Sequence, residues 1–451
     1  MLRKSIFLIL FMKIAFAKLI PTPFITDPIE IQRLNRNLTQ EYFQRSLFSQ
    51  CYGIALVQMR VSSPSGFLCV VSDPQWHRLV YSFGIETDSE RKGKWIYGFG
   101  SQGSGNGQFK NPRGLCIDSV TFQGDVNKYY VYVADRDNGR IVRLIYNSQD
   151  SLLDFYDNCM TSISHPSDVA CAVVSGTNSS YLVISESGLH RIRVYRVMQN
   201  LAIQSILNYG SYGSGVGQFN SPCGVEIVPI LESPGEYYIY VTDSGNNRIV
   251  CLRFNGSAIT WEKVYEDVSG VAGFNSVTAS EYYCVYVTAS GLGQVWVFAP
   301  GLNELLYRQG SYGSGNGQFL GPKDICIYKD EIAITEDWTA TTGIHYFKII
   351  PEVREFYPDP AIFDATEDSV KINFKVYETK HYLTMEIPDA GVTLFEEQEF
   401  VPGSYSVFWD GRDNNGKVVL PGEYLIRISC QGQVIATTTV RVKGTRVSGV
   451  E

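Results

Sequence analysis

The histidines of this 451-residue chain are the side chains best suited to move a proton or to hold a metal ion. Two imidazoles on one metal usually come from pairs such as His-x-His or His-x-x-x-His. The sequence has no such pair, and it lacks the G-x-S-x-G turn that presents a nucleophilic serine. We therefore assign no catalytic residue, no metal ligand and no cofactor. We expect polar roles in loops for the four central histidines, His77, His165, His190 and His345.

Glycine-rich loops could also do chemistry, because such loops cradle phosphates at helix N-termini. The string G-S-x-G-S-G-x-G-Q-F begins at Gly100, Gly210 and Gly310. Each copy is followed by a proline and a strand-like run, with neither a helix nor a lysine in the P-loop position; the prolines are Pro112, Pro222 and Pro322. The glycines then serve tight connections between strands, where positive φ and close backbone approach are needed.

An acidic residue followed five positions later by arginine recurs along the same region, after short β-branched and aromatic runs. Such a pair can form a charge-assisted hydrogen bond across a hairpin loop, so we expect a structural role for it. The pairs are Asp73 with Arg78, Asp135 with Arg140, Glu186 with Arg191 and Asp243 with Arg248. We expect Thr288 and Gly293 to replace both members in a fifth unit, and Glu336 with Thr341 to depart from the pattern in a sixth.

These six markers lie 45 to 62 residues apart, which suits about four strands per unit and predicts an all-β, six-bladed β-propeller. The glycine loops together with YVADRDNGRI (Tyr132 to Ile141) and YVTDSGNNRI (Tyr240 to Ile249) resemble NHL repeats. The resemblance covers residues 51–350 and implies six blades around a central channel. A ring needs its last blade completed from the other end of the chain, so we expect part of residues 18–50 to close it.

The sequence after residue 350 changes to a period-2 alternation. We expect a linker at 351–360, a small β-sandwich at 361–444 and a tail at 445–451. The stretch Trp409 to Ile428 resembles the immunoglobulin-like domain of flagellar hook-capping proteins, which implies an exported bacterial protein. A cluster of acids and amides could bind calcium, but it lacks the D-x-D-x-D-G alternation and is typical of turns: Asp410, Asp413, Asn414 and Asn415.

The first seventeen residues are typical of a secretory signal, with a basic start, an apolar stretch and the A-x-A site Ala15 to Ala17. We expect a secreted or cell-surface protein without a transmembrane segment. The net charge of -8 argues against nucleic acid as a partner. The ten cysteines favour buried free thiols, while one or two bridges remain open among Cys51, Cys159, Cys223, Cys251 and Cys430.

The connections from strand four to strand one and from strand two to strand three must emerge on the same side of a propeller, because strand direction alternates. Aromatic and cationic side chains gather there, as in binding surfaces. We expect a non-catalytic, monomeric binding or scaffold module for an extracellular or cell-surface protein, peptide or glycan. The alternative, from related six-bladed lyases and lactonases, is an enzyme with a channel metal. The expected binding face contains Trp76, His77, Arg113, Arg136, Tyr212, Tyr312, Lys323 and Trp338.

Overall fold

The computed structural model divides the chain into two compact units, one of residues 26–347 and one that includes residues 348–451. It describes residues 24–26, 50–59, 66–85, 92–118, 120, 124–280, 284–313, 318–328, 331–336, 343–349, 351–377, 380–430 and 432–443. The expected signal sequence, most of residues 18–50, the tail at 445–451, Trp338 and Thr341 lie outside these residues. Within them, no helix has the length and apolar character needed to cross a bilayer.

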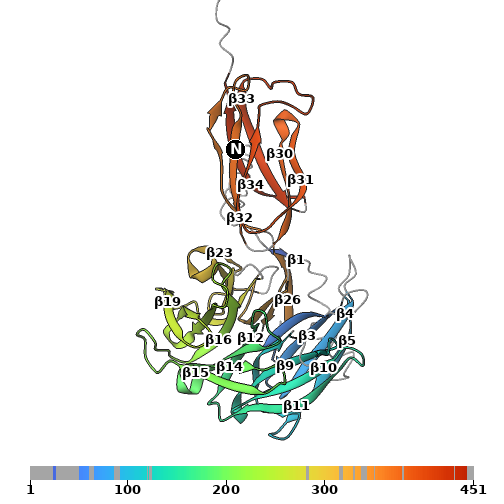
Figure 1. Cartoon of the computed structure of the whole chain (residues 1–451), viewed down its shortest axis with the longest axis vertical. Coiled ribbons are helices and arrows are strands. Elements are labelled where there is room, and N and C mark those ends of the chain that lie inside the picture. Colours follow the sequence, from blue (N-terminus) through green and yellow to red (C-terminus); the bar gives the residue numbers. More distant parts are fainter. Residues whose placement is uncertain are drawn as a thin grey trace, which may run out of the picture. The chain divides into compact units, whose positions relative to one another are not determined.

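The described part of the first unit is built mainly from four-stranded sheets (Figure 1), with a short parallel pair, β6 (Ser101–Gln102) and β7 (Gln108–Phe109), in the first glycine loop. The first sheet contains β2 (Ile54–Met59), β3 (Gly66–Asp73), β4 (Arg78–Ile85) and β5 (Lys92–Phe99). The second contains β8 (Pro112–Asp118), β9 (Lys128–Asp135), β10 (Arg140–Asn147) and β11 (Leu152–Thr161). The third contains β12 (Pro166–Val173), β13 (Ser180–Glu186), β14 (Arg191–Val197) and β15 (Ile203–Tyr209).

Three further sheets repeat this arrangement. The fourth contains β16 (Pro222–Pro229), β17 (Tyr237–Asp243), β18 (Arg248–Phe254) and β19 (Ile259–Glu266). The fifth contains β20 (Phe274–Ala279), β21 (Val285–Ala289), β22 (Gln294–Phe298) and β23 (Leu305–Gln309). In the sixth, β24 (Pro322–Tyr328), β25 (Glu331–Glu336) and β26 (Gly343–Ile349) are joined by β1 (Phe24–Thr26), which neighbours β26. That residues 18–50 stabilise the ring stays a prediction.

The first strands of the sheets form a closed ring, because each contacts the first strand of the next sheet and β24 contacts β2. This radial arrangement is a β-propeller. The second strands pack on both faces, as in β9, where seven of eight residues are buried. Outer strands such as β15 contain mostly exposed or half-buried residues. The near-continuous apolar runs in the sequence are therefore the second strands of the sheets, sandwiched between their neighbours.

Hydrogen bonds that involve side chains join neighbouring sheets around the ring. The hydroxyl of Thr335, on β25, donates to the carbonyl of Tyr52 at 2.5 Å, and the backbone N–H of Ile54 donates to Asp324 Oδ2, on β24, at 2.7 Å. These two bonds join the sixth sheet to the start of the first sheet, which closes the ring within the described residues. Thr242 makes the corresponding bond between the fourth and fifth sheets, to the carbonyl of Asn275 at 2.8 Å.

The second unit is a two-sheet sandwich with strand orders β27-β29-β32 and β28-β34-β33-β30-β31. Its strands are β27 (Val353–Asp359), β28 (Ile362–Phe363), β29 (Val370–Val376), β30 (His381–Ile387), β31 (Val392–Phe400), β32 (Gly403–Trp409), β33 (Gly422–Cys430) and β34 (Gln433–Val442). The structure differs here from the expected linker at 351–360. Residues 353–359 pair with β29, because Val353 and Phe356 pack against the sandwich core.

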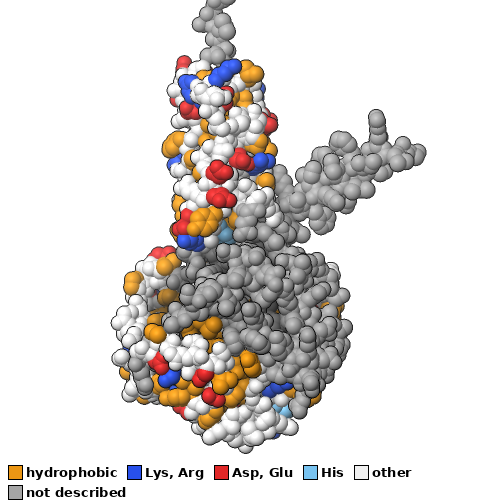
Figure 2. Space-filling model, turned by 90° about the vertical axis from the view of Figure 1, so that its right-hand side faces the viewer, with side chains coloured by type: hydrophobic (Ala, Val, Ile, Leu, Met, Phe, Trp, Pro, Cys, Tyr) orange, Lys and Arg blue, Asp and Glu red, His pale blue; other side chains and the backbone are white. Residues whose placement is uncertain are grey.

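The acidic turn of the sandwich is held by its own backbone. Asp413 Oδ1 accepts from the N–H groups of Asn415 and Lys417, both at 2.9 Å, and Asp410 Oδ1 accepts from Arg412 N at 3.1 Å. These bonds are those of Asx turns. Acidic, basic and hydrophobic side chains are interspersed on the surface of this unit (Figure 2). None of the ten cysteines, all of which lie among the described residues, forms a disulfide bond.

Candidate functional site

The second sheet shows what the acid–arginine pair does. Arg140 Nε donates to Asp135 Oδ2 at 2.7 Å. The other guanidinium nitrogens donate to carbonyls of the preceding glycine loop, to Ser104 at 2.8 Å and to Gln108 at 2.7 Å. Asn138, in the turn η2 (Arg136–Asn138), donates to Gly103 O at 2.8 Å. The pair therefore holds the glycine loop against the turn that follows the second strand.

The fourth sheet repeats this arrangement. Arg248 Nε donates to Asp243 Oδ2 at 2.8 Å, and its terminal nitrogens donate to Ser214 O at 2.6 Å and to Gln218 O at 2.8 Å. Asp243 is fully buried and Arg248 nearly so. Burial raises the pKa of Asp243, against hydrogen bonds from Asn220, Asn246 and Arg248 that lower it. All three nitrogens of the buried Arg248 guanidinium are hydrogen-bonded within the chain, and the structural role of this pair stays a prediction.

In three of the remaining sheets the acidic residue is also paired, but its partners differ. In the third, Glu186 binds both Arg191 at 2.5 Å and Arg193 at 2.6 Å, and burial, which raises the pKa of Glu186, is outweighed by these two hydrogen bonds, which lower it. In the first, Arg78 lies 3.4 Å from Asp73. In the sixth, Glu336 pairs with a residue that we had not expected, His345, at 2.6 Å.

The fifth sheet differs from the expected register by one residue. Ala289 and Gln294 stand opposite each other where the other sheets have the acid and the arginine, rather than Thr288 and Gly293. The hydroxyl of Thr288 accepts from Ser276 N at 2.9 Å. Thr288 thus corresponds to the residue before the acid, which is a Ser or Thr in four of the other five sheets. The marker assigned from sequence alone was one position early.

The expected binding face is only partly brought together. Arg113 and Arg136 line one pocket, whereas Tyr212 and Tyr312 are exposed on separate glycine loops. His77 is occupied structurally, since its Nδ1 accepts from Asn111 N at 3.0 Å. Two other expected members contribute outside the pocket: Trp76 is exposed beside Arg78, and the carbonyl of Lys323 accepts from Asn275 Nδ2.

Six residues, one from each sheet, occupy the same position just before the buried part of the first strand, at the mouth of the ring. Each lies two residues before an apolar residue that pairs with the second strand at the same register. Three of them directly follow the proline that opens a glycine-loop sheet. These mouth residues are Tyr52, Arg113, Ser167, Cys223, Asn275 and Lys323.

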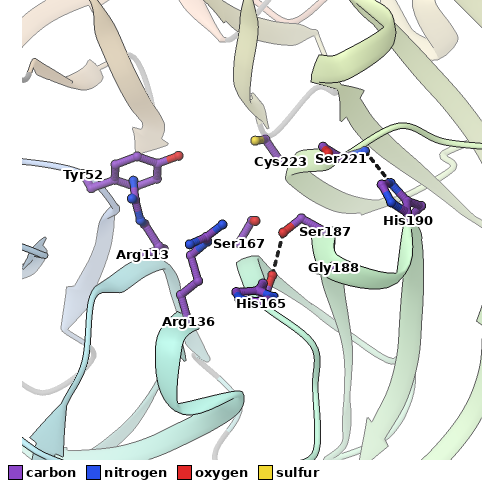
Figure 3. A pocket seen from close by; sticks show the side chains of 10 residues that line it. All are labelled: Tyr52, Arg113, Arg136, His165, Ser167, Ser187, Gly188, His190, Ser221 and Cys223. Atoms are coloured by element: carbon purple, nitrogen blue, oxygen red, sulfur yellow. Dashed lines mark hydrogen bonds between the residues drawn. The ribbon is translucent and has the colours of Figure 1, made fainter. Parts of the chain in front are cut away.

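A pocket of about 410 Å³ lies at this mouth, over the first four sheets. In Figure 3, Arg113 and Arg136 stand on one side and Ser187, Gly188 and His190 on the other. None of the lining residues is acidic. They are Tyr52, Arg113, Arg136, His165, Ser167, Ser187, Gly188, His190, Ser221 and Cys223.

The two arginines are held differently. The Arg113 guanidinium lies 4.2 Å from the centroid of the Tyr52 ring, and its buried Nε has no hydrogen-bond partner among the described residues. Arg136 Nη1 lies 3.3 Å from Asp137 Oδ1, at a side chain that is 34% exposed. Tyr52 donates to Asn275 Oδ1 at 3.4 Å, and burial raises the pKa of its hydroxyl. The pocket therefore contains two cationic hydrogen-bond donors, and one of them, Arg113, packs on an aromatic ring.

Two of the other polar side chains of the pocket are hydrogen-bonded to the backbone. Ser187 Oγ donates to His165 O at 2.7 Å, and His190 Nδ1 accepts from Ser221 N at 2.9 Å. Both histidines adopt positive φ, at 50° and 53°. Burial raises the pKa of Cys223, although Arg113 and Arg136 act to lower it, so the thiol form is favoured. The hydroxyl, the imidazole and the thiol are thus not arranged as an activated nucleophile.

Three carboxyl groups lie below the mouth on the first strands. Asp168 Oδ2 accepts from Val225 N at 2.9 Å, and Asp324 accepts from Ile54 N. Burial raises the pKa of Asp324 to about 6 and that of Glu226 to about 7, and burial and the nearby Asp324 raise that of Asp168. Gly114 makes room here, because a Cβ at this position would lie 1.9 Å from Asp168 Oδ1. Among the described residues, no group of three or more His, Cys, Asp or Glu could hold a metal ion.

Sequence reasoning missed most of the pocket. Tyr52, Ser167, Ser187, Ser221 and Cys223 are ordinary residues in the sequence, and none belongs to a motif. A usable signal was the position after the proline that opens a first strand, which is occupied by Arg113, Ser167, Cys223 and Lys323. Aligning the six units at that position would have grouped these side chains at the mouth of the ring.

No protein-family model matches the chain, and no curated protein matches it. Among solved structures, a gluconolactonase from Xanthomonas campestris is 12% identical over 67% of this chain and 86% of that one, with a TM-score of 0.41. Virginiamycin B lyase from Staphylococcus aureus is 11% identical over 67% of this chain and 96% of its own, with a TM-score of 0.39. PorZ, a bacterial surface component of the type-IX secretion system of Porphyromonas gingivalis, is 11% identical over 86% of this chain and 51% of its own, with a TM-score of 0.38. At these values the likenesses assign no activity to this chain.

Proposed function

We propose that the chain is an exported bacterial propeller of the NHL-repeat type, with six blades and a C-terminal immunoglobulin-like sandwich, and that it acts as a non-catalytic binding module. The ring of first strands and the three glycine loops support this assignment of the repeat. The proposed ligand is an extracellular or cell-surface protein, peptide or glycan. The sandwich serves surface retention or export.

The observation that carries the binding role is the mouth pocket. Its donors, Arg113 and Arg136, come from the second sheet, and the hydroxyls and imidazoles opposite come from the third. Two groups that an enzyme could use as nucleophile and base, the hydroxyl of Ser187 and the imidazole of His190, are hydrogen-bonded to the backbone instead. A concave site with fixed donors and no activated nucleophile suits recognition rather than turnover.

The binding role is tested by incubating the labelled full chain on arrays of glycans and peptides. The account expects a defined set of bound species that is lost when Arg113 and Arg136 are both replaced by Gln. Arg253→Gln is the matched control, because Arg253 is also 34% exposed and also paired with an acid, Glu236, but lies outside the pocket. If the double variant still bound the same species, the mouth pocket would not be the binding site.

The second candidate is an enzyme with a metal in the channel. Its candidate ligands would be Asp168 and Asp324, which are close enough to interact electrostatically, and Glu226 on the first strand of the fourth sheet, although these do not form a metal-holding group among the described residues. Metal analysis of the purified chain after dialysis against calcium, magnesium or zinc distinguishes the two. One ion per chain that is lost in Asp168→Asn would favour the enzyme, whereas no retained ion favours the binding module.

A further inference from the structure

The charged side chains that line the mouth pocket are both arginines and both come from the second sheet. Arg113 stands at the mouth itself, and Arg136 reaches the same pocket from the turn η2 of the same sheet. No acidic side chain lines the pocket. Two guanidinium groups that share one pocket repel each other, and an anion bound between them would relieve that repulsion.

The donors in the pocket are not all used by the protein. Arg113 Nε is buried without a hydrogen-bond partner among the described residues, and such a group is costly unless something binds it. The Arg113 guanidinium carbon lies over the Tyr52 ring, 4.2 Å from its centroid, and this cation–π contact helps to position the guanidinium. Ser167 is a largely buried residue that also lines the pocket, and its hydroxyl makes no hydrogen bond to the part of the chain that the structure describes.

The negative charges nearest the pocket do not cancel these donors. Asp137 pairs with Arg136 at the rim, where both side chains are about one-third exposed. Asp168 and Asp324 lie below, and each accepts hydrogen bonds from backbone N–H groups of its own and the next first strand. Burial raises the pKa of both. A ligand that enters the pocket therefore meets mainly the arginines.

We propose that this pocket binds a small organic acid by its carboxylate or another oxyanion, placed between Arg113 and Arg136. Planar guanidinium groups match the two oxygens of a carboxylate, and the charge assists each hydrogen bond. A pocket of about 410 Å³ is at the lower end of the range for small-molecule sites, so it admits a group of the size of one sugar acid. This inference rests on the proposed function, because it names the chemistry that the same site would recognise.

Isothermal titration calorimetry of the full chain tests the inference with glucuronate, glucose and inorganic phosphate. Glucose is the neutral counterpart of glucuronate, and phosphate separates a free oxyanion from a sugar acid. We expect glucuronate to bind and glucose not to bind. Binding of phosphate alone would keep the oxyanion chemistry and exclude the sugar acid as its source. If neither glucuronate nor phosphate binds, the inference is overturned.

The variants assign that binding to the pocket. Arg136→Gln, at a partly exposed side chain, should weaken glucuronate binding about tenfold or more, and Arg113→Lys should weaken it less than Arg113→Gln. Arg253→Gln changes the net charge by the same amount and should leave binding within about twofold. Equal losses in Arg136→Gln and Arg253→Gln would mean non-specific attraction and would overturn the site. Each variant is accepted only if its melting temperature matches that of the parent chain, and Arg136→Gln keeps the test open if Arg113→Gln does not fold.

The array and the calorimetry can fail independently. Loss of array binding in the double variant without any glucuronate or phosphate binding would leave the binding module and remove the anion. Glucuronate binding without any array ligand would leave the anion site and remove the macromolecular partner. The two proposals are therefore distinguishable in the same set of proteins.

Discussion

In the first four sheets, the turn between the second and third strands carries the acid–arginine pair, and we call this turn the corner of the sheet. A glycine loop packs on the corner, and so covers it, in the second and fourth sheets, whereas none does so in the third sheet. In the covered corners the arginine uses one nitrogen for the acid and the others for loop carbonyls. In the third sheet the connection at 162–165 is short, and two arginines share Glu186. The mouth pocket lies beside this uncovered corner and is lined by His165, Ser187 and His190. The acid–arginine pair therefore holds a glycine loop in the second and fourth sheets, whereas in the third sheet a pocket lies beside it.

The largest expected effect is the loss of the arginine from a covered corner. Arg248→Ala leaves Asp243 buried without its partner and frees the carbonyls of Ser214 and Gln218. Because breaking a buried, hydrogen-bonded pair is expensive, we expect a loss of about 3 kcal/mol. Arg191→Ala, at the uncovered corner, leaves Arg193 on Glu186 and should cost about 1 kcal/mol. Thermal unfolding of the full chain measures the loss of stability in both variants. Similar losses would show that the arginine contributes no more in the covered corner than in the uncovered one.

The glycine loop provides the next effect. Gly213 has φ of 147°, and a Cβ there would lie 2.3 Å from Gln218 Oε1. Gly213→Ala should therefore cost about 2 kcal/mol, from backbone strain and the displaced side chain. Gly176 also has a positive φ, of 71°, but no atom lies within 4 Å of the place where a Cβ would be. Gly176→Ala should therefore cost only about 1 kcal/mol of stability. Melting temperatures that fall equally would mean that the fit of the loop does not matter.

The carboxyl groups below the mouth predict a dependence of stability on pH. Burial raises the pKa of Glu226 from 4.5 to about 7, so the folded chain keeps a proton that the unfolded chain releases. This contribution is fully present below about pH 4.5 and is lost as pH rises through about 7. The slope is roughly 1.4 kcal/mol per pH unit for one proton at most. Glu226→Gln should flatten the melting-temperature profile between pH 5 and 7, and an unchanged slope would contradict the assignment.

The smallest effect is expected at the exposed tip of a glycine loop. Tyr212 is 68% exposed and contacts the ring of His190 at 4.8 Å. Tyr212→Ala should change the stability by less than about 0.5 kcal/mol, as is usual for surface positions. It should also leave glucuronate binding unchanged, because Tyr212 does not line the pocket. A clear loss of glucuronate binding in this variant would extend the site onto the glycine loop.

The sequence predicted the propeller because its signals are local and repeated. Short apolar runs, glycine loops and acid–arginine spacings each specify one hairpin, and their repetition predicts the ring. The fifth marker was misplaced because Thr288 and Ala289 carry no charge that would fix the register. The strand at 353–359 was expected to be part of a linker. Its Pro358 is compatible with pairing because β27 is an edge strand of its sheet, where proline is tolerated.

The pocket could not be predicted in the same way, because it is assembled from different sheets. Tyr52 and Asn275 are more than two hundred residues apart in the chain, yet they are hydrogen-bonded at the mouth. Arg113 and Arg136 were singled out as aromatic or cationic loop residues, but so were Tyr212 and Tyr312, which lie elsewhere. Only the closure of the ring decides which of these side chains share a site.

A crystal structure of the full chain grown with saturating glucuronate tests the central claim most directly. The account predicts density for a carboxylate between Arg113 and Arg136, with Arg113 still stacked on Tyr52 and the glycine loops at Gly100 and Gly210 unmoved. Glucuronate bound at another surface, or an empty mouth pocket at saturation, would contradict it.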